Sequence, residues 1–83
     1  MSFDIKWNPN ASKNLEKLPK DLILRVFKKL DQIKEDPFRY LESFQNSNLY
    51  KLRIGDYRAL IDIAFEDKIL LIQVFDKRGR VYK

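Results

Sequence analysis

The sequence has no cysteine and no histidine among its 83 residues. Their absence excludes disulfide frameworks, thiol nucleophiles, zinc fingers and imidazole acid–base catalysis. No apolar run approaches the roughly 20 residues that cross a membrane, and the amino terminus lacks a basic-then-apolar signal. We therefore expect a cytoplasmic protein without membrane contact, in which any catalysis uses other side chains. We also expect no cofactor.

What remains is a short, basic chain. Residues 1–83 suffice for a single small domain, and 45% hydrophobic with 35% charged residues is typical of a globular protein. Seventeen Lys and Arg against twelve Asp and Glu leave a net charge of +5. This excess favours an acidic partner such as nucleic acid or an anionic protein, although similar charge also serves solubility.

The first part of the chain predicts a strand followed by two helices. Apolar and polar residues alternate over residues 2–7, as in a strand with one buried face. Asn8-Pro9 then supplies a helix start, and Pro19 interrupts that helix and begins the next, which ends before Pro37. The polar side of the second helix is interpreted as solvated surface; it carries Lys20, Arg25, Lys28, Lys29 and Asp31.

The second part predicts a β-meander. Residues 38–48 indicate a packed connecting segment and a turn, and strands are expected at 49–54, 57–65 and 69–75. Gly55-Asp56 and Asp67-Lys68 mark the reversals, so the three strands are sequential and antiparallel. The fold class is α+β, with two layers and the first strand at the sheet edge or beside the last strand. One face of the middle strand is expected to take the helices: Ala59, Ile61, Ile63 and Phe65.

Basic residues gather around the predicted meander. Lys51 and Arg53 share one face by parity, and Arg58 starts the next strand across the turn. Further cations and a tyrosine follow the last strand: Lys77, Arg78, Arg80 and Tyr82. Together they favour a site for a phosphate chain and its bases. The alternative is that they are ordinary strand-edge charges, or partners of Asp56, Asp62 and Asp76.

Four segments together resemble the RelE-like toxins of bacterial and archaeal toxin–antitoxin systems. They are the Leu15-Glu16-Lys17-Leu18-Pro19 turn, the Asp36-Pro37 helix exit, the hairpin from Tyr50 to Arg58, and the end from Lys77 to Tyr82. The resemblance implies a microbial-ribonuclease-like fold and a RelB-like antitoxin that masks the toxin. It also implies ribosome-dependent cleavage of messenger RNA in the A site, without metal, through attack by the ribose 2′-OH.

The same resemblance assigns roles to individual residues. Lys51, Arg58, Arg78 and Tyr82 match catalytic positions, whereas Arg53, Lys77 and Arg80 are expected to bind RNA. Arg58 and Arg78 would stabilise the charge of a phosphorane-like transition state, and neighbouring cations would favour loss of a proton from Lys51. Tyr82 would stack on a base, protonate the leaving 5′-oxygen, or simply pack. Some relatives carry another lysine where this chain has Leu49.

Two further functions stay open at the level of sequence. One is a ParE-like toxin of the same fold, which inhibits DNA gyrase and cuts no RNA. The other is a catalytically inactive module that only associates with an antitoxin or with RNA. Cleavage assays, supercoiling assays and toxicity on expression would separate these alternatives from the nuclease.

Overall fold

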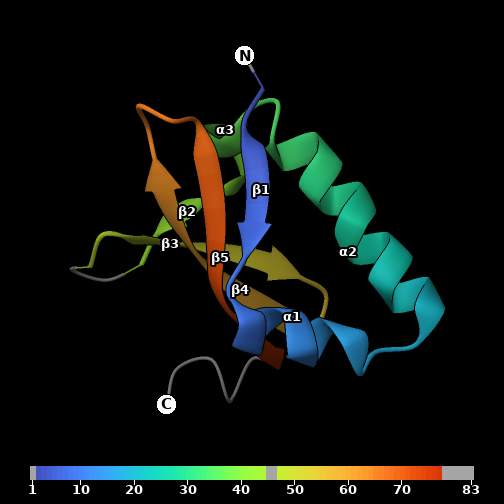
Figure 1. Ribbon diagram of the computed structural model, residues 1–83. Helices are drawn as coiled ribbons and strands as arrows, with labels where there is room; N and C mark the ends of the chain where they lie inside the picture. Colours follow the sequence, from blue (N-terminus) through green and yellow to red (C-terminus); the bar gives the residue numbers. More distant parts are fainter. Residues whose placement is uncertain (1, 45–46, 78–83) are drawn as a thin grey trace.

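Figure 1 shows the computed structural model, which describes residues 2–44 and 47–77, as one sheet with helices along one side. The elements, in order, are β1 (Asp4–Trp7), α1 (Pro9–Glu16), α2 (Lys20–Ile33), α3 (Pro37–Tyr40), β2 (Glu42–Ser43), β3 (Leu49–Ile54), β4 (Tyr57–Ala64) and β5 (Ile69–Lys77). This arrangement confirms the α+β class. No described helix is long and apolar enough to cross a membrane.

The two longer helices form where the sequence predicts them. The Asn8 side chain accepts a hydrogen bond from the backbone N–H of Asn10 at 3.0 Å, and Pro9 occupies the first turn of α1. α1 ends before Pro19, and α2 follows it with Val26, Leu30 and Ile33 on its buried stripe. The predicted helical hairpin is therefore confirmed.

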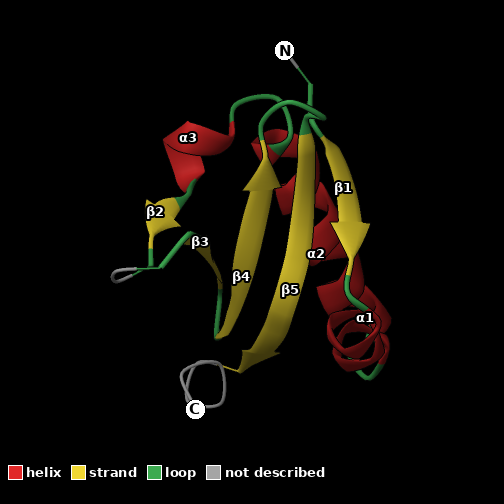
Figure 2. Ribbon diagram, turned by 60° about the vertical axis from the view of Figure 1, so that its left-hand side comes forward, coloured by secondary structure: helices red, strands yellow, loops and turns green. Residues whose placement is uncertain are grey.

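The sheet has the strand order β1-β5-β4-β3-β2. β3, β4 and β5 are antiparallel neighbours, as the predicted meander requires, and β1 runs parallel to β5 at the sheet edge. The expected place of the first strand, beside the last one, is confirmed. Figure 2 shows α2 behind the sheet, α1 beyond the end of β1 and α3 beside β2. We call the face that packs on α1 and α2 the inner face and the opposite one the outer face.

Two short elements were not predicted. Residues 37–48 contain α3 and β2, and β2 pairs with β3 to make the sheet five-stranded instead of a meander plus one strand. A four-residue helix and a two-residue strand are too short to show a period in the sequence. β2 matters for the site because it places Glu42 opposite Lys51.

A bulge explains why the apolar run of β5 packs as it does. Leu60 pairs with Val74 while Ile61 pairs with Ile72, so Gln73 is the extra residue of β5. The bulge reverses the parity of the strand. Consequently Leu70, Ile72 and Phe75 all belong to the inner core, although strict alternation would turn Phe75 outward.

One core prediction is wrong. β4 ends at Ala64, so Phe65 lies in the turn and is 55% exposed instead of facing the helices. Its ring stacks on that of Phe38, with the centroids 5.8 Å apart. The other three residues expected on the inner face, Ala59, Ile61 and Ile63, are buried in the core.

The turn between β3 and β4 follows the predicted hairpin chemistry. Gly55 has a φ of 57°, whereas Asp56 is not among the described residues with a positive φ. A positive φ at the first central residue alone is what a type II′ turn requires, and glycine adopts it without steric penalty. The tight turn keeps the first residues of β4 directly beside the last residues of β3.

Candidate functional site

The outer face of the β3–β4 hairpin carries the basic residues. Leu52 and Ile54 are buried in the core on the inner face. Because side chains alternate along a strand, Lys51 and Arg53 lie on the outer face, as predicted. Arg53 is directly opposite Arg58, so these two side chains share that face with Cβ atoms about 5 Å apart. We call Lys51, Arg53 and Arg58 the outer strip.

Lys51 has an acidic neighbour that the sequence did not reveal. Its Nζ lies 3.7 Å from Oε2 of Glu42, across the β2–β3 pairing. Glu42 is well exposed, with 75% of its side chain accessible, so this ion pair contributes little to stability. An exposed carboxylate therefore stands beside the Lys51 ammonium group, in addition to the neighbouring cations expected from the sequence.

Arg58 is the most constrained member of the outer strip. It is the buried charged residue of the described chain, with 5% exposure. Its Nη1 donates hydrogen bonds to the carbonyl oxygens of Gly55 and Tyr57, both at 2.8 Å. A charged donor on two turn carbonyls braces the hairpin, which is a role that sequence reasoning missed. The Nε and Nη2 groups are not used in these two bonds.

The charge around Arg58 is mixed. Arg53 faces it from β3, whereas Asp76 faces it from β5 in the same register. Like charges directly opposite each other are unfavourable, and the carboxylate on the other side offsets part of that repulsion. Arg53 and Arg58 therefore form a cation pair next to the turn. An anion bound there would relieve the remaining repulsion between them.

The remaining predicted site residues lie elsewhere or outside the described part. Lys77 pairs with Tyr57, and the ring of Tyr57 stacks on Phe75 at 5.4 Å. Parity therefore places Lys77 on the inner side, away from the outer strip. Arg78, Arg80 and Tyr82 fall outside the described residues. Tyr57 packs against the core.

Metal-ligating side chains do not cluster in the described part of the chain. Within residues 2–44 and 47–77, no three His, Cys, Asp or Glu side chains lie close enough to hold a metal ion. What the outer strip offers chemically is positive charge and fixed N–H donors. These groups bind oxyanions, above all phosphate.

The structure combines a single sheet, helices on one face of that sheet, and a basic hairpin. Over residues 5–82 the sequence matches the profile of a family described as the ParE toxin of type II toxin–antitoxin system, parDE. Because the match spans nearly all of the chain, the protein belongs to this toxin family, within the RelE/ParE superfamily. The family expected from the sequence is confirmed.

Individual relatives agree with this assignment. The candidate toxin RelE1 of Methanocaldococcus jannaschii is 24% identical, over 100% of this chain and 98% of the relative. The structure is similar to the RelBE2 toxin–antitoxin complex of Mycobacterium tuberculosis, with a TM-score of 0.85 and 22% identity over 94% of this chain and 100% of that chain. It is also similar to the archaeal RelE–RelB complex of Pyrococcus horikoshii, with a TM-score of 0.81 and 26% identity over 96% and 99%.

Proposed function

We propose that this toxin is a ribosome-dependent endoribonuclease that cleaves messenger RNA in the ribosomal A site, in the cytoplasm. The observation that carries the proposal is the outer strip, which puts Lys51, Arg53 and Arg58 on the sheet face opposite α1 and α2. Within residues 2–44 and 47–77 no helix lies over this face, which leaves room for an extended RNA strand. Cations aligned along a strand edge suit a chain of phosphodiesters.

The proposed reaction is transesterification within the RNA. The ribose 2′-oxygen forms a bond to the adjacent phosphorus while the bond from phosphorus to the 5′-oxygen breaks, leaving a 2′,3′-cyclic phosphate and a 5′-hydroxyl. A base takes the 2′-OH proton, and an acid returns a proton to the leaving oxygen. Lys51 is the proposed base, and Tyr82, beyond the described residues, is the proposed acid.

Arg58 would act electrostatically rather than by moving a proton. Negative charge builds up on the nonbridging oxygens in the transition state, and a guanidinium that is already fixed needs no reorganisation to stabilise it. The two bonds from Nη1 to the turn provide that fixation. Arg78 is proposed to assist in the same way, while Arg53 and Arg80 hold the flanking RNA backbone. Lys77, on the inner side of the sheet, is not part of this set.

The ion pair between Lys51 and Glu42 bears on this scheme. An RNA phosphate that approaches Lys51 must compete with the Glu42 carboxylate 3.7 Å away. Since Glu42 is exposed on a two-residue edge strand, it can turn toward solvent at little expense. We therefore treat Glu42 as a modest restraint on substrate binding.

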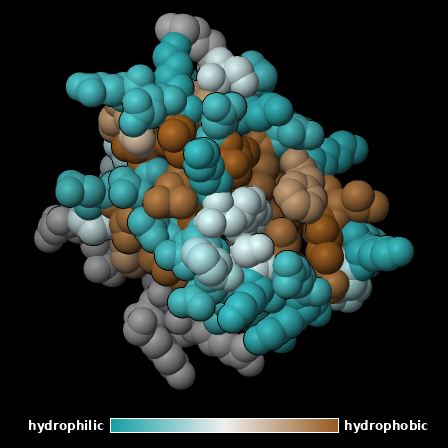
Figure 3. Space-filling model, viewed as in Figure 1, coloured by the Kyte–Doolittle hydropathy of each residue, from teal (hydrophilic) through white to brown (hydrophobic). Residues whose placement is uncertain are grey.

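A RelB-like antitoxin is the proposed partner. The solved relatives from Mycobacterium tuberculosis and Pyrococcus horikoshii are complexes of a toxin with its antitoxin. The net charge of +5 favours an acidic partner. α2 also exposes two large apolar side chains, Leu24 at 68% and Phe27 at 45%, and Figure 3 shows apolar atoms exposed on that side. An amphipathic helical antitoxin would cover such surface.

A translation extract programmed with a defined message tests the nuclease. The purified chain should cut the message only when ribosomes are translating it. Chelation of divalent ions after the ribosomes are loaded should leave the cut ends unchanged, as a 2′,3′-cyclic phosphate and a 5′-hydroxyl. A cognate antitoxin should abolish cutting. Intact message at saturating toxin would contradict the proposal.

Gyrase inhibition is the second candidate, because the matching family profile is that of the ParE toxin. Supercoiling of relaxed plasmid by purified gyrase, with and without the chain, separates the two candidates. The nuclease proposal expects unchanged supercoiling and cut message. Loss of supercoiling with intact message would favour the gyrase target instead.

A further inference from the structure

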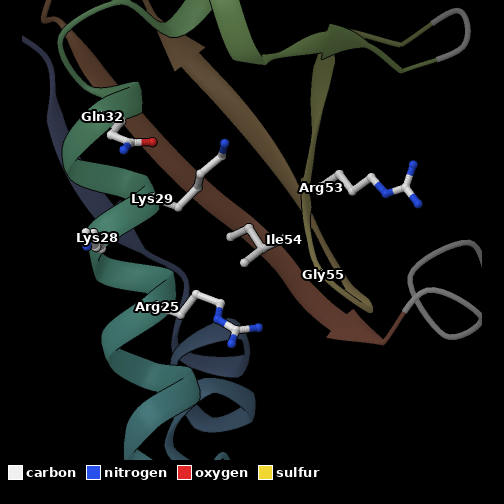
Figure 4. A pocket seen from close by; sticks show the side chains of 7 residues that line it. All are labelled: Arg25, Lys28, Lys29, Gln32, Arg53, Ile54 and Gly55. Carbon is white, nitrogen blue, oxygen red and sulfur yellow. The ribbon is translucent and has the colours of Figure 1, made fainter.

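A second basic surface lies on the opposite side of the hairpin from the outer strip. A cleft of about 270 Å³ lies between α2 and the β3–β4 turn, and Figure 4 shows the side chains that line it. Its lining comes from Arg25, Lys28, Lys29 and Gln32 on α2 and from Ile54 and Gly55 on the hairpin. We propose that this α2 cleft binds a backbone phosphate of RNA, at a contact distinct from the outer strip.

Helical spacing aligns the cations of the cleft. Arg25, Lys28, Lys29 and Gln32 follow one another at i, i+3, i+4 and i+7, so they form one stripe along α2. The stripe adjoins the buried Val26 and Leu30, which anchor the helix on the sheet. The cations therefore project from a rigid element whose position is set by the core.

Two of the side chains are directed toward the cleft. In Figure 4 Arg25 extends from α2 toward the hairpin and Lys29 reaches into the space between the helix and β3. The Nζ of Lys29 also lies 4.7 Å from the centroid of the Tyr40 ring. Such a cation–π contact orients the ammonium group without neutralising it.

Within residues 2–44 and 47–77, the ion pairs Lys34–Asp31 and Lys51–Glu42 involve none of the α2 cations of the cleft. The acid nearest in sequence to the hairpin side is Asp56, which lines an adjoining hollow together with Arg25. Neither Asp nor Glu is among the described residues that line the cleft itself. Arg25 and Lys29, the two cations directed toward the cleft, repel each other, and an oxyanion between them would relieve that repulsion.

The shape of the cleft favours a backbone phosphate over a whole nucleotide. Its volume is below the about 300–1,000 Å³ of pockets that enclose a small ligand. At the hairpin side, nothing lies within 4 Å of the place where a Gly55 side chain would start, so the turn leaves the backbone open to approach. Gln32 adds an amide donor to the guanidinium and ammonium groups.

The two basic surfaces meet at the tip of the hairpin. Arg53 borders the α2 cleft, yet in Figure 4 its side chain extends away from α2. A single RNA chain that passes around the hairpin tip would therefore contact the cleft and the outer strip in turn. The inference goes beyond the proposed function, since it requires RNA binding but no cleavage.

Salt-dependent binding to a labelled oligouridine of about 12 nucleotides tests the inference, because each neutralised phosphate of a single strand adds about 0.7 to the slope of log affinity against log salt. The cleft variant combines Arg25→Gln, Lys28→Gln and Lys29→Gln. Its matched control combines Lys13→Gln, Lys17→Gln and Lys20→Gln, which removes the same charge from exposed positions outside the cleft. Thermal unfolding establishes that both variants fold.

The cleft variant should lose at least about tenfold in affinity and about 0.7 from the salt slope, as expected for one phosphate, whereas the control should lose less than about threefold in affinity. Equal losses in the two variants, or no binding by the wild-type chain, would overturn the inference. A loss of affinity for poly-L-glutamate with RNA binding unchanged would also overturn it, since the cleft would then recognise an acidic protein. A message left uncut on ribosomes would contradict only the proposed nuclease.

Discussion

The inner and outer faces of the β3–β4 hairpin are formed by alternate residues of the same two strands, yet the two faces have different roles. On the inner face Leu52, Ile54 and Ile61 are sealed beneath the helices. Among the described residues, no helix lies over the outer face, which carries Lys51, Arg53 and Arg58. Residues that stabilise the fold therefore lie on one side of the hairpin, and the candidate site lies on the other. Substitutions at alternate positions along a strand should affect either stability or function.

Arg58 is the exception to this separation. It belongs to the outer strip by register but is buried and bonded to the turn carbonyls. A substitution there changes the structure of the hairpin as well as its charge. The comparison between the faces therefore needs variants at Lys51 and Arg53 for function, and Arg58 has to be interpreted together with stability.

The largest expected effect on stability is on the inner face. Phe75 is 1% exposed and its ring contacts Trp7 at 5.9 Å and Tyr57 at 5.4 Å. Phe75→Ala should lower the free energy of unfolding by about 3–5 kcal/mol, because it removes buried surface and leaves a cavity. Urea unfolding followed by circular dichroism measures this. Arg53→Ala, at an exposed position of the outer face, is the control and should change it by less than about 0.5 kcal/mol.

Arg58→Ala should have the next largest effect. It removes two charged hydrogen bonds to the carbonyls of Gly55 and Tyr57, for a loss of about 1.5–3 kcal/mol. Arg58→Lys keeps the charge but cannot reproduce both bonds from one planar group, so it should recover only part of the loss. Full recovery by lysine in the same urea titration would show that charge, and not the hairpin brace, is what the residue supplies.

A smaller effect is expected at the turn. Gly55 has a φ of 57°, and nothing lies within 4 Å of a Cβ built there. Gly55→Ala should therefore be destabilising by about 1–2 kcal/mol through backbone conformation alone. Gly55→Asn should lose less, because asparagine visits the left-handed region more readily. Equal stability of the alanine and asparagine variants would contradict a left-handed conformation at position 55.

The smallest stability effect, with an informative functional one, is expected for Glu42. Glu42→Gln removes an exposed ion pair and should change the free energy of unfolding by at most about 1 kcal/mol. It also frees Lys51 from the carboxylate 3.7 Å away, so RNA affinity should rise by up to about fivefold. Fluorescence anisotropy with a labelled oligonucleotide measures it. Weaker binding by Glu42→Gln would mean that Glu42 positions Lys51 rather than competing for it.

Elements with a clear period were predictable from the sequence. Burial follows directly from two patterns in the sequence. One is the 3.6-residue stripe of α2, with Val26 and Leu30, and the other is the alternation at Leu52, Arg53 and Ile54. Gly55 identified the turn because few residues other than glycine adopt a positive φ there. These local signals sufficed for two helices, four strands and the parity of the outer strip.

Features that depend on contacts between distant segments were not predictable. β2 exists because β3 offers it an edge, and only that pairing brings Glu42 to Lys51. The bulge at Gln73 follows from the need to bury Phe75 with Ile72. Likewise, the sequence showed Arg25, Lys28 and Lys29 on a polar helix side, but not that the hairpin closes a cleft over them.

The most direct test of the central claim compares message cleavage on translating ribosomes by two doubly substituted chains. One carries Lys51→Gln and Arg53→Gln on the outer strip, and the other carries Lys13→Gln and Lys17→Gln on exposed positions with the same loss of charge. Primer extension measures the rate of cutting. The account predicts at least about a hundredfold loss for the outer-strip variant and near wild-type cutting for the control. Equal rates for the two chains, with both folded, would contradict it.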